Sequence, residues 1–502
     1  MDRIRKNPTL HGWQNALPDL KEIRPELRSL SSQFQLKLPV MESTGATLRI
    51  SLGLPEPSGD FPRAAIEWTL QNILKPAGIE AVVLPVASDD VDISIQSGTN
   101  ETEQISFPSG LDLWTRFARG EPVRKVNFVA TVCAGQDVPA LVTANGKIDL
   151  VATAFFFLSG YDERQTTRRD RHGRFVFEGS IADQLDCSKV PVVDYIRNHV
   201  LNLLVEKGLA PVRKHSWCIC PTVDIDYTKK WRPGIVYREV VQSPLFNIRA
   251  ESFRERTSRL ARSAGQFVTN NRVYEDSLKF IRENIESHGG RGTFFFKGGG
   301  ADPYDVRYRL SGQVKKFIRS AKKSGHEIGL HPSYWAAVDR ERLHAEKKTL
   351  ESVTGEPINV VRSHYLRWSE QTASMYVAAG FTVDSTLGYS ETVGFRRGTC
   401  VPFVTFDFES GRSSRLTEHP LIVMESALFN RMYLGVEDAI KHTCELLDHA
   451  RKVDGSPVVL WHNIIRDRVD CPGWDRHFVE VMHYAVESGA KVTAVSDNFC
   501  SE

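Results

Sequence analysis

The chain has 502 residues, which is too long for a single ordinary hydrophobic core, so we expect two or three domains. Its 64 basic and 62 acidic residues give a formal net charge of +2, and these charges are scattered along the chain. This balance argues against a nucleic-acid or other polyanionic partner, and no apolar run approaches the length of a membrane span.

Residues 1–45 are polar and poorly periodic, and we expect them to form an extension or a loosely packed cap. They lack the layout of a signal peptide, because acids such as Asp2 and Glu22 lie among the bases and no apolar segment is present. The eight cysteines include no CxxC pair, and we interpret them as apolar core residues of a reducing compartment. The sequence therefore predicts a soluble, cytoplasmic protein of the size of an enzyme.

The first half of the chain has the pattern of a small α/β unit. Apolar periodicity predicts strands from Thr47 onward, over 81–86 and over 91–95, with a helix over 64–74. A later helix over 192–205 is broken by the segment 208–211. We place the domain boundary there, which gives an N-terminal α/β domain of unknown function over 1–212 and a second domain over 213–502.

Residues 152–175 join an apolar, helix-like run to a cluster of mixed charge. The run contains the segment 155–158, and charged residues crowd the segments 162–164 and 170–174. Dense mixed charge could form a site, but it more often forms a salt-bridged surface. We therefore expect this segment to dock one domain onto the other.

A second apolar run, residues 216–227, contains two carboxylates one residue apart, Asp224 and Asp226. It has the pattern of a buried strand, in which alternate side chains share a face, so both carboxylates look beyond the C-terminal end of the strand. Two acids this close repel unless a cation such as a metal ion or an arginine lies beside them. The alternative is an ordinary turn, because Asp is common where a strand stops.

Later strands of the same half also end in polar residues. Strands are predicted over 293–296, 327–330, 359–361, 381–383, 421–424 and 458–460, and His331, Arg362, Asp384 and His462 follow four of them. Helical patterns separate these strands. Repeated strand-then-helix units with polar residues after successive strands predict a parallel (β/α) barrel whose C-terminal rim is the active face.

Five of these segments, taken in order, resemble the motifs of the polysaccharide deacetylases, the NodB-like carbohydrate esterase 4 type. They are Thr222 to Asp226, Gly325 to His331, Arg362 to Tyr365, Asp384, and Leu460 to His462. The resemblance covers 213–502 and implies a distorted, incomplete (β/α) barrel that hydrolyses an N- or O-acetyl group on a sugar with the help of a metal. The segments 155–163 and 170–175 also resemble an uncharacterised domain found ahead of a divergent branch of such deacetylases.

The resemblance implies roles for the residues that match the motifs. Asp224 is the general base, Asp226 and His331 are metal ligands, and Arg362 keeps Asp224 ionised through a charge-assisted pair. For the remaining steps, the backbone N–H of Tyr365 receives the oxyanion, His462 protonates the leaving nitrogen and Asp384 orients His462. Together these groups supply what amide hydrolysis requires: an activated water, a stabilised oxyanion and an acid.

One position departs from the family pattern. The family usually has a second metal histidine one helical turn after the first, and Trp335 stands there in this chain. His364 is the natural substitute, because the family normally has proline at that place in its Arg-x-Pro-Tyr motif. The alternative is that His364 is only a polar residue of the rim. An Asp226, His331 and His364 set with an open position suits zinc.

We therefore expect a cytoplasmic, zinc-dependent hydrolase that removes an acetyl group from an acetylated sugar or glycan precursor, within carbohydrate metabolism such as exopolysaccharide biosynthesis. The retained base, acid and arginine favour this interpretation. Two alternatives stay open: a catalytically silent relative that binds glycans or a partner protein, which the missing histidine favours, and a metal-dependent hydrolase of a non-sugar amide. The substrate and the oligomeric state do not follow from the sequence.

Overall fold

The computed structural model describes residues 46–53, 60–83, 93–96, 105–211, 215–242, 252–300 and 303–497. The expectation that residues 1–45 form an extension or cap lies outside these residues. Residues 44–502 form one compact unit. Of the helices that the structure describes, none is both long enough and apolar enough to cross a membrane. The seven described cysteines are unpaired, as expected for core cysteines.

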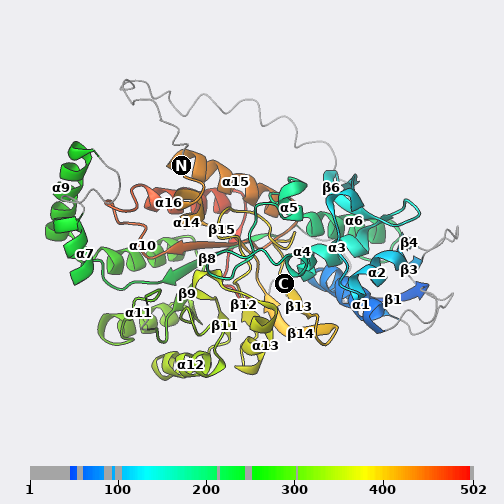
Figure 1. The fold of residues 1–502 in the computed structure, drawn as a ribbon, viewed down its shortest axis with the longest axis horizontal. Coiled ribbons are helices and arrows are strands. Elements are labelled where there is room, and N and C mark those ends of the chain that lie inside the picture. The colour runs from blue at the N-terminus through cyan, green and yellow to red at the C-terminus, as the bar shows by residue number, and fades with distance from the viewer. Residues whose placement is uncertain are drawn as a thin grey trace, which may run out of the picture. The chain divides into compact units, whose positions relative to one another are not determined.

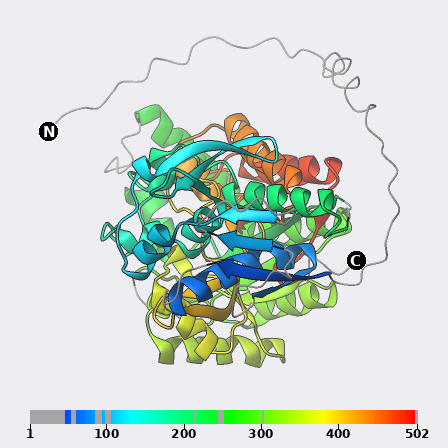
Figure 2. The same cartoon turned by 90° about the vertical axis from the view of Figure 1, so that its right-hand side faces the viewer.

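The first half of the described chain contains two small sheets. The strands of the first are β1 (Ala46–Gly53), β2 (Ile79–Val83), β3 (Ile93–Gln96) and β4 (Ile105–Pro108), which are parallel and lie side by side in the order β2-β1-β3-β4 (Figure 2). The strands of the second, which is antiparallel, are β5 (Phe128–Cys133), β6 (Gln136–Val142) and β7 (Ile148–Asp149). The predicted small α/β unit is confirmed.

Helix α3 forms the centre of this half. The helices here are α1 (Asp60–Leu74), α2 (Leu111–Ala118), α3 (Leu150–Ser159), α4 (Tyr161–Gln165), α5 (Ile181–Gln184) and α6 (Val192–Glu206), with short 3-10 turns η1 (Lys75–Ala77) and η2 (Lys125–Asn127). Asp149 begins α3, because its side chain accepts a hydrogen bond from the Ala152 N–H at 2.8 Å. The buried ring of Phe155 then packs against the rings of Trp68, Trp114 and Phe117 at centroid distances of 5.0 to 5.8 Å.

The second half is built on a larger, mostly parallel sheet. Its described strands are β8 (Cys218–Ile225), β9 (Thr293–Phe296), β10 (Glu327–Leu330), β11 (Val360–Val361), β12 (Val383–Asp384), β13 (Phe403–Asp407), β14 (Arg412–Glu418), β15 (Leu421–Met424), β16 (Val458–His462) and β17 (Lys491–Val492). The order is β13-β14-β12-β11-β10-β9-β8-β16-β15, with β17 beside β8. Every pair is parallel except β13 with β14. The fold is therefore α/β, with parallel and antiparallel strand pairs.

The predicted (β/α) barrel, which the resemblance implied to be distorted and incomplete, is not confirmed, because the described strands form an open sheet. The pairing runs from β13 to β15 and does not join these two ends. One end is instead covered by the first half of the chain: Trp68 Nε1 on α1 donates to Val404 O at 2.8 Å, and Phe155 packs against Phe406 at 5.3 Å. The antiparallel hairpin β13–β14, which the sequence did not reveal, thus ends the sheet as a docking surface for α1 and α3.

The described helices and turns of the second half are α7 (Pro233–Tyr237), the π-helical η3 (Arg238–Gln242), α9 (Phe253–Thr269), α10 (Val273–Ser287), α11 (Gly312–Lys323), α12 (Arg340–Thr354), the 3-10 turn η4 (His364–Leu366), α13 (Glu370–Ala378), α14 (Glu425–Asn430), α15 (Val436–Lys452) and α16 (Trp474–Glu487). Most of these helices flank the parallel strands, whereas α9 projects away from them (Figure 1). The apolar face of α10 packs into the core, where Leu278, Ile281 and Ile285 are buried.

The parallel pairing brings the C-terminal ends of the strands to one edge. Val361 of β11 lies opposite both Leu330 of β10 and Asp384 of β12, and His462 of β16 lies opposite Asp224 of β8. The polar residues that follow these strands therefore meet at this edge, as the sequence predicted.

One buried histidine makes the stability of this core depend on pH. Trp461 Nε1–H donates to Nδ1 of His477 on α16 at 3.2 Å, and Nε2 of His477 lies 3.0 Å from Thr443 Oγ1. Burial lowers the pKa of His477 from 6.5 to about 3. Between these two values the unfolded chain binds more protons than the folded chain, so the free energy of unfolding decreases as the pH falls through this window.

We expect His477→Gln to weaken the pH dependence of the free energy of unfolding by about 1.4 kcal/mol per pH unit between roughly pH 4 and pH 6. Denaturant titrations at several pH values measure the slope. The control is His483→Gln on the same helix, whose exposed side chain should leave the slope unchanged. Equal slopes in His477→Gln and the parent would contradict this account. His419, whose pKa burial also lowers to about 3, accounts for part of the remaining slope.

Candidate metal and catalytic site

Strand β8 carries two carboxylates to the common edge. All eight of its residues, Cys218 to Ile225, are buried, and Asp226 follows the last of them. Asp224 and Asp226 are 2% and 8% exposed, which is too little for two ionised groups without partners. The turn interpretation therefore fails, and the partners of the two acids define the site.

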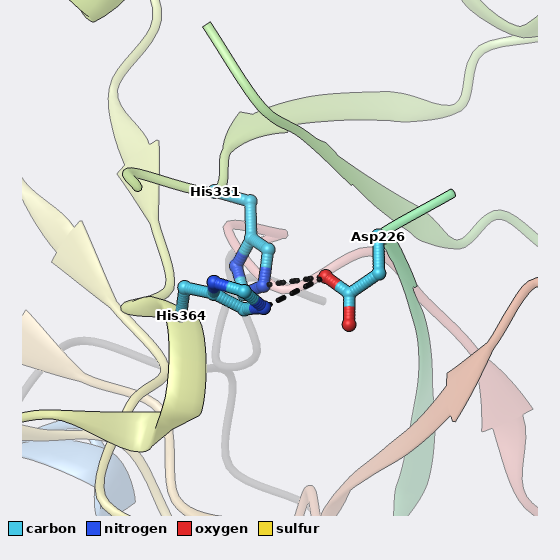
Figure 3. Close-up of side chains that lie close together, drawn as sticks. All are labelled: Asp226, His331 and His364. Atoms are coloured by element: carbon cyan, nitrogen blue, oxygen red, sulfur yellow. Dashed lines mark ion pairs between the residues drawn. The ribbon is translucent and has the colours of Figure 1, made fainter. Parts of the chain in front are cut away.

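Asp226, His331 and His364 form a compact cluster (Figure 3). His331 follows β10 and His364 begins η4 after β11. The Oδ1 atom of Asp226 lies 3.4 Å from His331 Nε2 and 3.2 Å from His364 Nε2, and one ligand atom from each residue lies within 4.8 Å of the others. The structure thus brings together the three residues that the sequence predicted as metal ligands.

The contacts of the two histidines fit a cation between these groups. His331 Nδ1–H donates to Arg362 O at 2.6 Å, because a carbonyl can only accept, so Nε2 is the nitrogen that faces Asp226. In His364, Nε2 likewise faces Asp226, and Nδ1 lies 2.7 Å from Asp305 Oδ1 without hydrogen-bond geometry. Asp226 Oδ1 is buried, and no hydrogen-bond donor reaches it from the described residues. Two imidazole nitrogens and one carboxylate oxygen therefore fit a divalent ion with an open position, as in catalytic zinc sites.

Positive charge near Asp226 stabilises its ionised carboxylate. Burial opposes ionisation of Asp226, but His364, His331 and Lys297 outweigh burial and hold its pKa well below the ordinary value. Burial likewise opposes the charged form of His364, but Asp226 and Asp305 outweigh it and raise the pKa of His364. The buried Nζ of Lys297, just after β9, lies 4.0 Å from Asp226 Oδ1 and 3.6 Å from Asp305 Oδ1. A proton on His364 and a metal ion are thus alternative ways to neutralise Asp226.

The second carboxylate, Asp224, is held by Arg362. Nη1 of the fully buried Arg362 lies 3.2 Å from Asp224 Oδ1 and 2.7 Å from Thr222 Oγ1. The other carboxylate oxygen, Oδ2, lies 3.7 Å from His331 Nε2. The predicted pair between Arg362 and Asp224 is present, and it leaves Oδ2 directed toward the cluster.

His462 lies on the opposite side of the same cluster and is oriented by Glu425. Its Nδ1 lies 2.8 Å from Oε1 of Glu425, the first residue of α14, and its Nε2 lies 3.7 Å from Asp226 Oδ2. The backbone N–H of His462 donates to the same Glu425 oxygen at 2.7 Å. Burial opposes protonation of His462, but Glu425 and Asp226 outweigh it and raise its pKa to about 10.

Asp384, which the sequence predicted as the residue that orients His462, lies elsewhere. Among the described residues no ion pair joins it to His462, because β12 and β16 are separated by four strands in the sheet. Asp384 is instead fully buried opposite Glu418 of β14 and makes a short contact with Thr386 Oγ1 at 2.5 Å. Burial and, to a smaller extent, the charge of Asp384 raise the pKa of Glu418 well above its usual value. Burial also raises the pKa of Asp384, to about 6. These two carboxyls therefore share a proton beside Arg362.

The backbone of Tyr365 is held by the first half of the chain. Tyr365 has a left-handed conformation (φ 61, ψ 13), which is uncommon for residues other than glycine. Arg174 Nη1 donates to Tyr365 O at 2.9 Å, and the ring of His172 packs on that of Tyr365 at 4.8 Å. Asp170 accepts two hydrogen bonds from the Arg174 side chain. The predicted docking role of residues 152–175 is confirmed by these contacts.

Three residues of this site escaped sequence reasoning. Glu425, Asp305 and Lys297 are all buried and contact a predicted site residue. Glu425 and Lys297 come directly after strands β15 and β9, so the rule that placed His331 and Arg362 could have found them.

Trp335, at the position of the missing histidine, is 42% exposed and packs beside Tyr334 at 5.1 Å.

The comparisons with known proteins found one family model and several solved structures. A family of unknown function (DUF7033) matches residues 78–209. No curated protein matches the chain. Among solved structures, the chain is similar to a candidate polysaccharide deacetylase from Mycobacterium smegmatis, with 18% identity over 57% of this chain and 89% of that chain and a TM-score of 0.36. It is also similar to the peptidoglycan deacetylase PdaC from Bacillus subtilis (13% identity, 57% and 91% covered, TM-score 0.29) and to a CE4 family pseudoenzyme from Bacillus anthracis (11% identity, 57% and 66% covered, TM-score 0.30).

Protein purified without added metal should contain about one zinc ion per chain, because three ligands and an open position suit this ion. Elemental analysis and competition with a chromophoric chelator measure content and affinity. His331→Ala and His364→Ala should each lose the ion, and Trp335→Ala on the exposed loop should keep it. If His364→Ala binds zinc as tightly as the parent while His331→Ala does not, His364 is not a ligand.

Proposed function

We propose that this protein is a metal-dependent hydrolase that removes an acetyl group from an acetylated sugar or glycan precursor. One observation carries the proposal: three kinds of catalytic group surround the Asp226 carboxylate. Its Oδ1 atom faces the two imidazoles of the metal cluster, and its Oδ2 atom lies 3.7 Å from His462 Nε2. Asp224 Oδ2 lies 3.7 Å from His331 on the same edge. The ordered motifs that resemble the polysaccharide deacetylases support the same reaction.

Asp224 is suited to the role of general base. Arg362 donates to its Oδ1 and leaves Oδ2 to accept a proton from the attacking water. The buried surroundings keep bulk water away from the pair. A carboxylate in this position does not need to touch the metal to act.

His462 is suited to the role of general acid. Glu425 fixes Nδ1 and raises the pKa of His462 to about 10, which favours the charged imidazole with its Nε2–H facing the cluster. That proton passes to the leaving nitrogen when the C–N bond breaks, while the water supplies the hydroxyl of the released acetate. The N–H of Tyr365, next to His364, is the candidate donor to the oxyanion. The ion held by Asp226, His331 and His364 would, when bound, act as a Lewis acid on the acetyl carbonyl.

Lys297 favours a second candidate function, a catalytically silent module that binds glycans or a protein partner. Its buried ammonium lies 4.0 Å from Asp226 and offers this carboxylate a positive charge in place of a metal. Hydrolysis of a non-sugar amide is the other alternative. Residues 1–212 as a domain of unknown function, a cytoplasmic location, and zinc as the ion stay predictions of the sequence.

The catalytic proposal predicts that Asp224→Asn and His462→Gln lose acetate release from acetylated sugars by about a hundredfold or more, since each removes a positioned base or acid. Neither change removes a ligand of the metal, so zinc content should match the parent. Acetate is measured enzymatically over a panel of acetylated mono- and oligosaccharides. If the zinc-loaded parent releases no more acetate than Asp224→Asn on every sugar, the hydrolase proposal fails and the silent module replaces it.

Glu425→Gln should lower kcat by about tenfold or more with little change in KM, because the amide cannot hold His462 as a charged acid. Glu239→Gln is the matched control: it removes a buried acid that pairs with Arg259 outside the site and retains the Glu425–His462 pair. Acetate release at saturating sugar measures both variants. If Glu239→Gln loses as much kcat as Glu425→Gln while both remain folded, orientation of His462 by Glu425 is not what limits the rate.

A further inference from the structure

A cleft between the two halves of the chain is lined by residues whose buried polar atoms lack hydrogen-bond partners among the described residues. Its lining comes from α3, α4, the segment 169–175 and the start of α13. The side chain of Arg397 belongs to this lining and is 2% exposed. Arg397, Trp368 and Ser159 all line the cleft, and no described residue makes a hydrogen bond to Nε or Nη1 of Arg397, to Nε1 of Trp368 or to Oγ of Ser159. Buried donors of this kind are rare unless a ligand or water completes them.

The charges around the cleft leave a positive surplus. Glu163 is neutralised by Arg396, whose Nε and Nη2 donate to it at 2.8 and 2.7 Å, so Arg397 makes only a longer contact of 3.4 Å with Glu163. At the mouth, Arg164 pairs with Glu370 at 2.7 Å. Within the described part of the chain, the hydrogen bonds of the Arg169 side chain all go to backbone carbonyls. Arg396 and Arg397 therefore share the single carboxylate of Glu163, and Arg169 forms no ion pair with a described residue.

The shape of the cleft suits a molecule with an apolar or flat part. Rings of Phe175, Trp368 and Phe408 form its sides, and the Arg397 guanidinium lies 5.3 Å from the Trp368 ring. Gly160 has φ 70, and a Cβ there would overlap the Arg397 guanidinium. Glycine at this position thus allows the guanidinium to lie against the backbone at the bottom of the cleft.

We propose that this cleft binds the oxyanion of a small organic ligand, a carboxylate or a phosphate, between Arg397, Trp368 and Ser159. A planar guanidinium with an indole N–H and a hydroxyl matches the acceptor oxygens of either group. The cleft is linked to the segment that carries His364, because Gly173 lines it while its neighbours His172 and Arg174 contact Tyr365. The oxyanion belongs either to the sugar substrate or to a separate small molecule.

The test is calorimetric titration of the full chain with two probes, inorganic phosphate and phenyl phosphate, after removal of metal by a chelator. Saturable binding is expected, tighter for phenyl phosphate because of the aromatic sides. Arg397→Met should weaken it by about tenfold or more, the usual effect of losing a charge-assisted hydrogen bond. Arg168→Gln removes an equal charge outside the cleft and should leave the affinity unchanged, and so should Asp226→Asn at the metal cluster.

A second variant keeps the proposal falsifiable if Arg397→Met does not fold. Ser159→Ala combined with Trp368→Phe removes two donors and retains the Arg397–Glu163 pair, and it should also weaken binding. Three outcomes would each overturn the proposal. The first is unchanged affinity in both this double variant and a folded Arg397→Met. The second is that neither probe binds saturably to the parent, and the third is that Asp226→Asn loses binding.

Steady-state kinetics of acetate release can show whether the oxyanion belongs to the sugar substrate or to a separate molecule. This comparison rests on the proposed hydrolase function. If the substrate carries it, Arg397→Met raises KM for an acetylated sugar with a carboxylate and not for a neutral one. If a separate molecule carries it, KM for the two sugars changes equally or not at all. Failure of acetate release in the parent would remove only this kinetic comparison, because the calorimetric result does not depend on activity.

Discussion

The guanidinium of Arg362 holds the catalytic edge of the large sheet together. It donates to Thr222 and Asp224 of β8 and to the backbone and side chain of Ser385, and it lies 4.4 Å from the ring of Phe295 on β9. One fully buried group thus connects β8, β9, β11 and the end of β12. Breaking a buried ion pair by removing one partner costs about 3–5 kcal/mol, so the placement of Asp224 and the integrity of this edge depend on the same interaction.

The first half of the chain is part of this site and not a separate appendage. Its α1 and α3 pack on the hairpin β13–β14, Arg396 pairs with Glu163, and Arg174 holds the carbonyl of Tyr365. The left-handed backbone at Tyr365 is retained because groups from both halves surround it. A change in the loop 170–174 therefore acts on the Tyr365 side of the site without touching Asp226, His331 or His364.

The site balances its charges in two separate groups. Around Asp226 the cluster needs positive charge, which His364, Lys297 or a metal ion can supply. Around Arg362, Asp384 and Glu418 share a proton, so that the guanidinium faces Asp224 as its main anionic partner. Because the strands β8 to β11 separate β12, which carries Asp384, from β16, which carries His462, Asp384 acts on Arg362 and not on His462.

The sequence by itself determined the strands that end in functional residues and the set of groups that meet at their ends. Strands β9, β10 and β15 match the predicted bounds, because burial of successive apolar residues is a local pattern. Only the tertiary structure decided that Glu425 orients His462, that the hairpin β13–β14 leaves the described sheet open, and that Arg397 lies without a full partner in a cleft between the halves. These features depend on which strands become neighbours and on what covers them, and packing between distant segments leaves no periodic signal in the residues themselves.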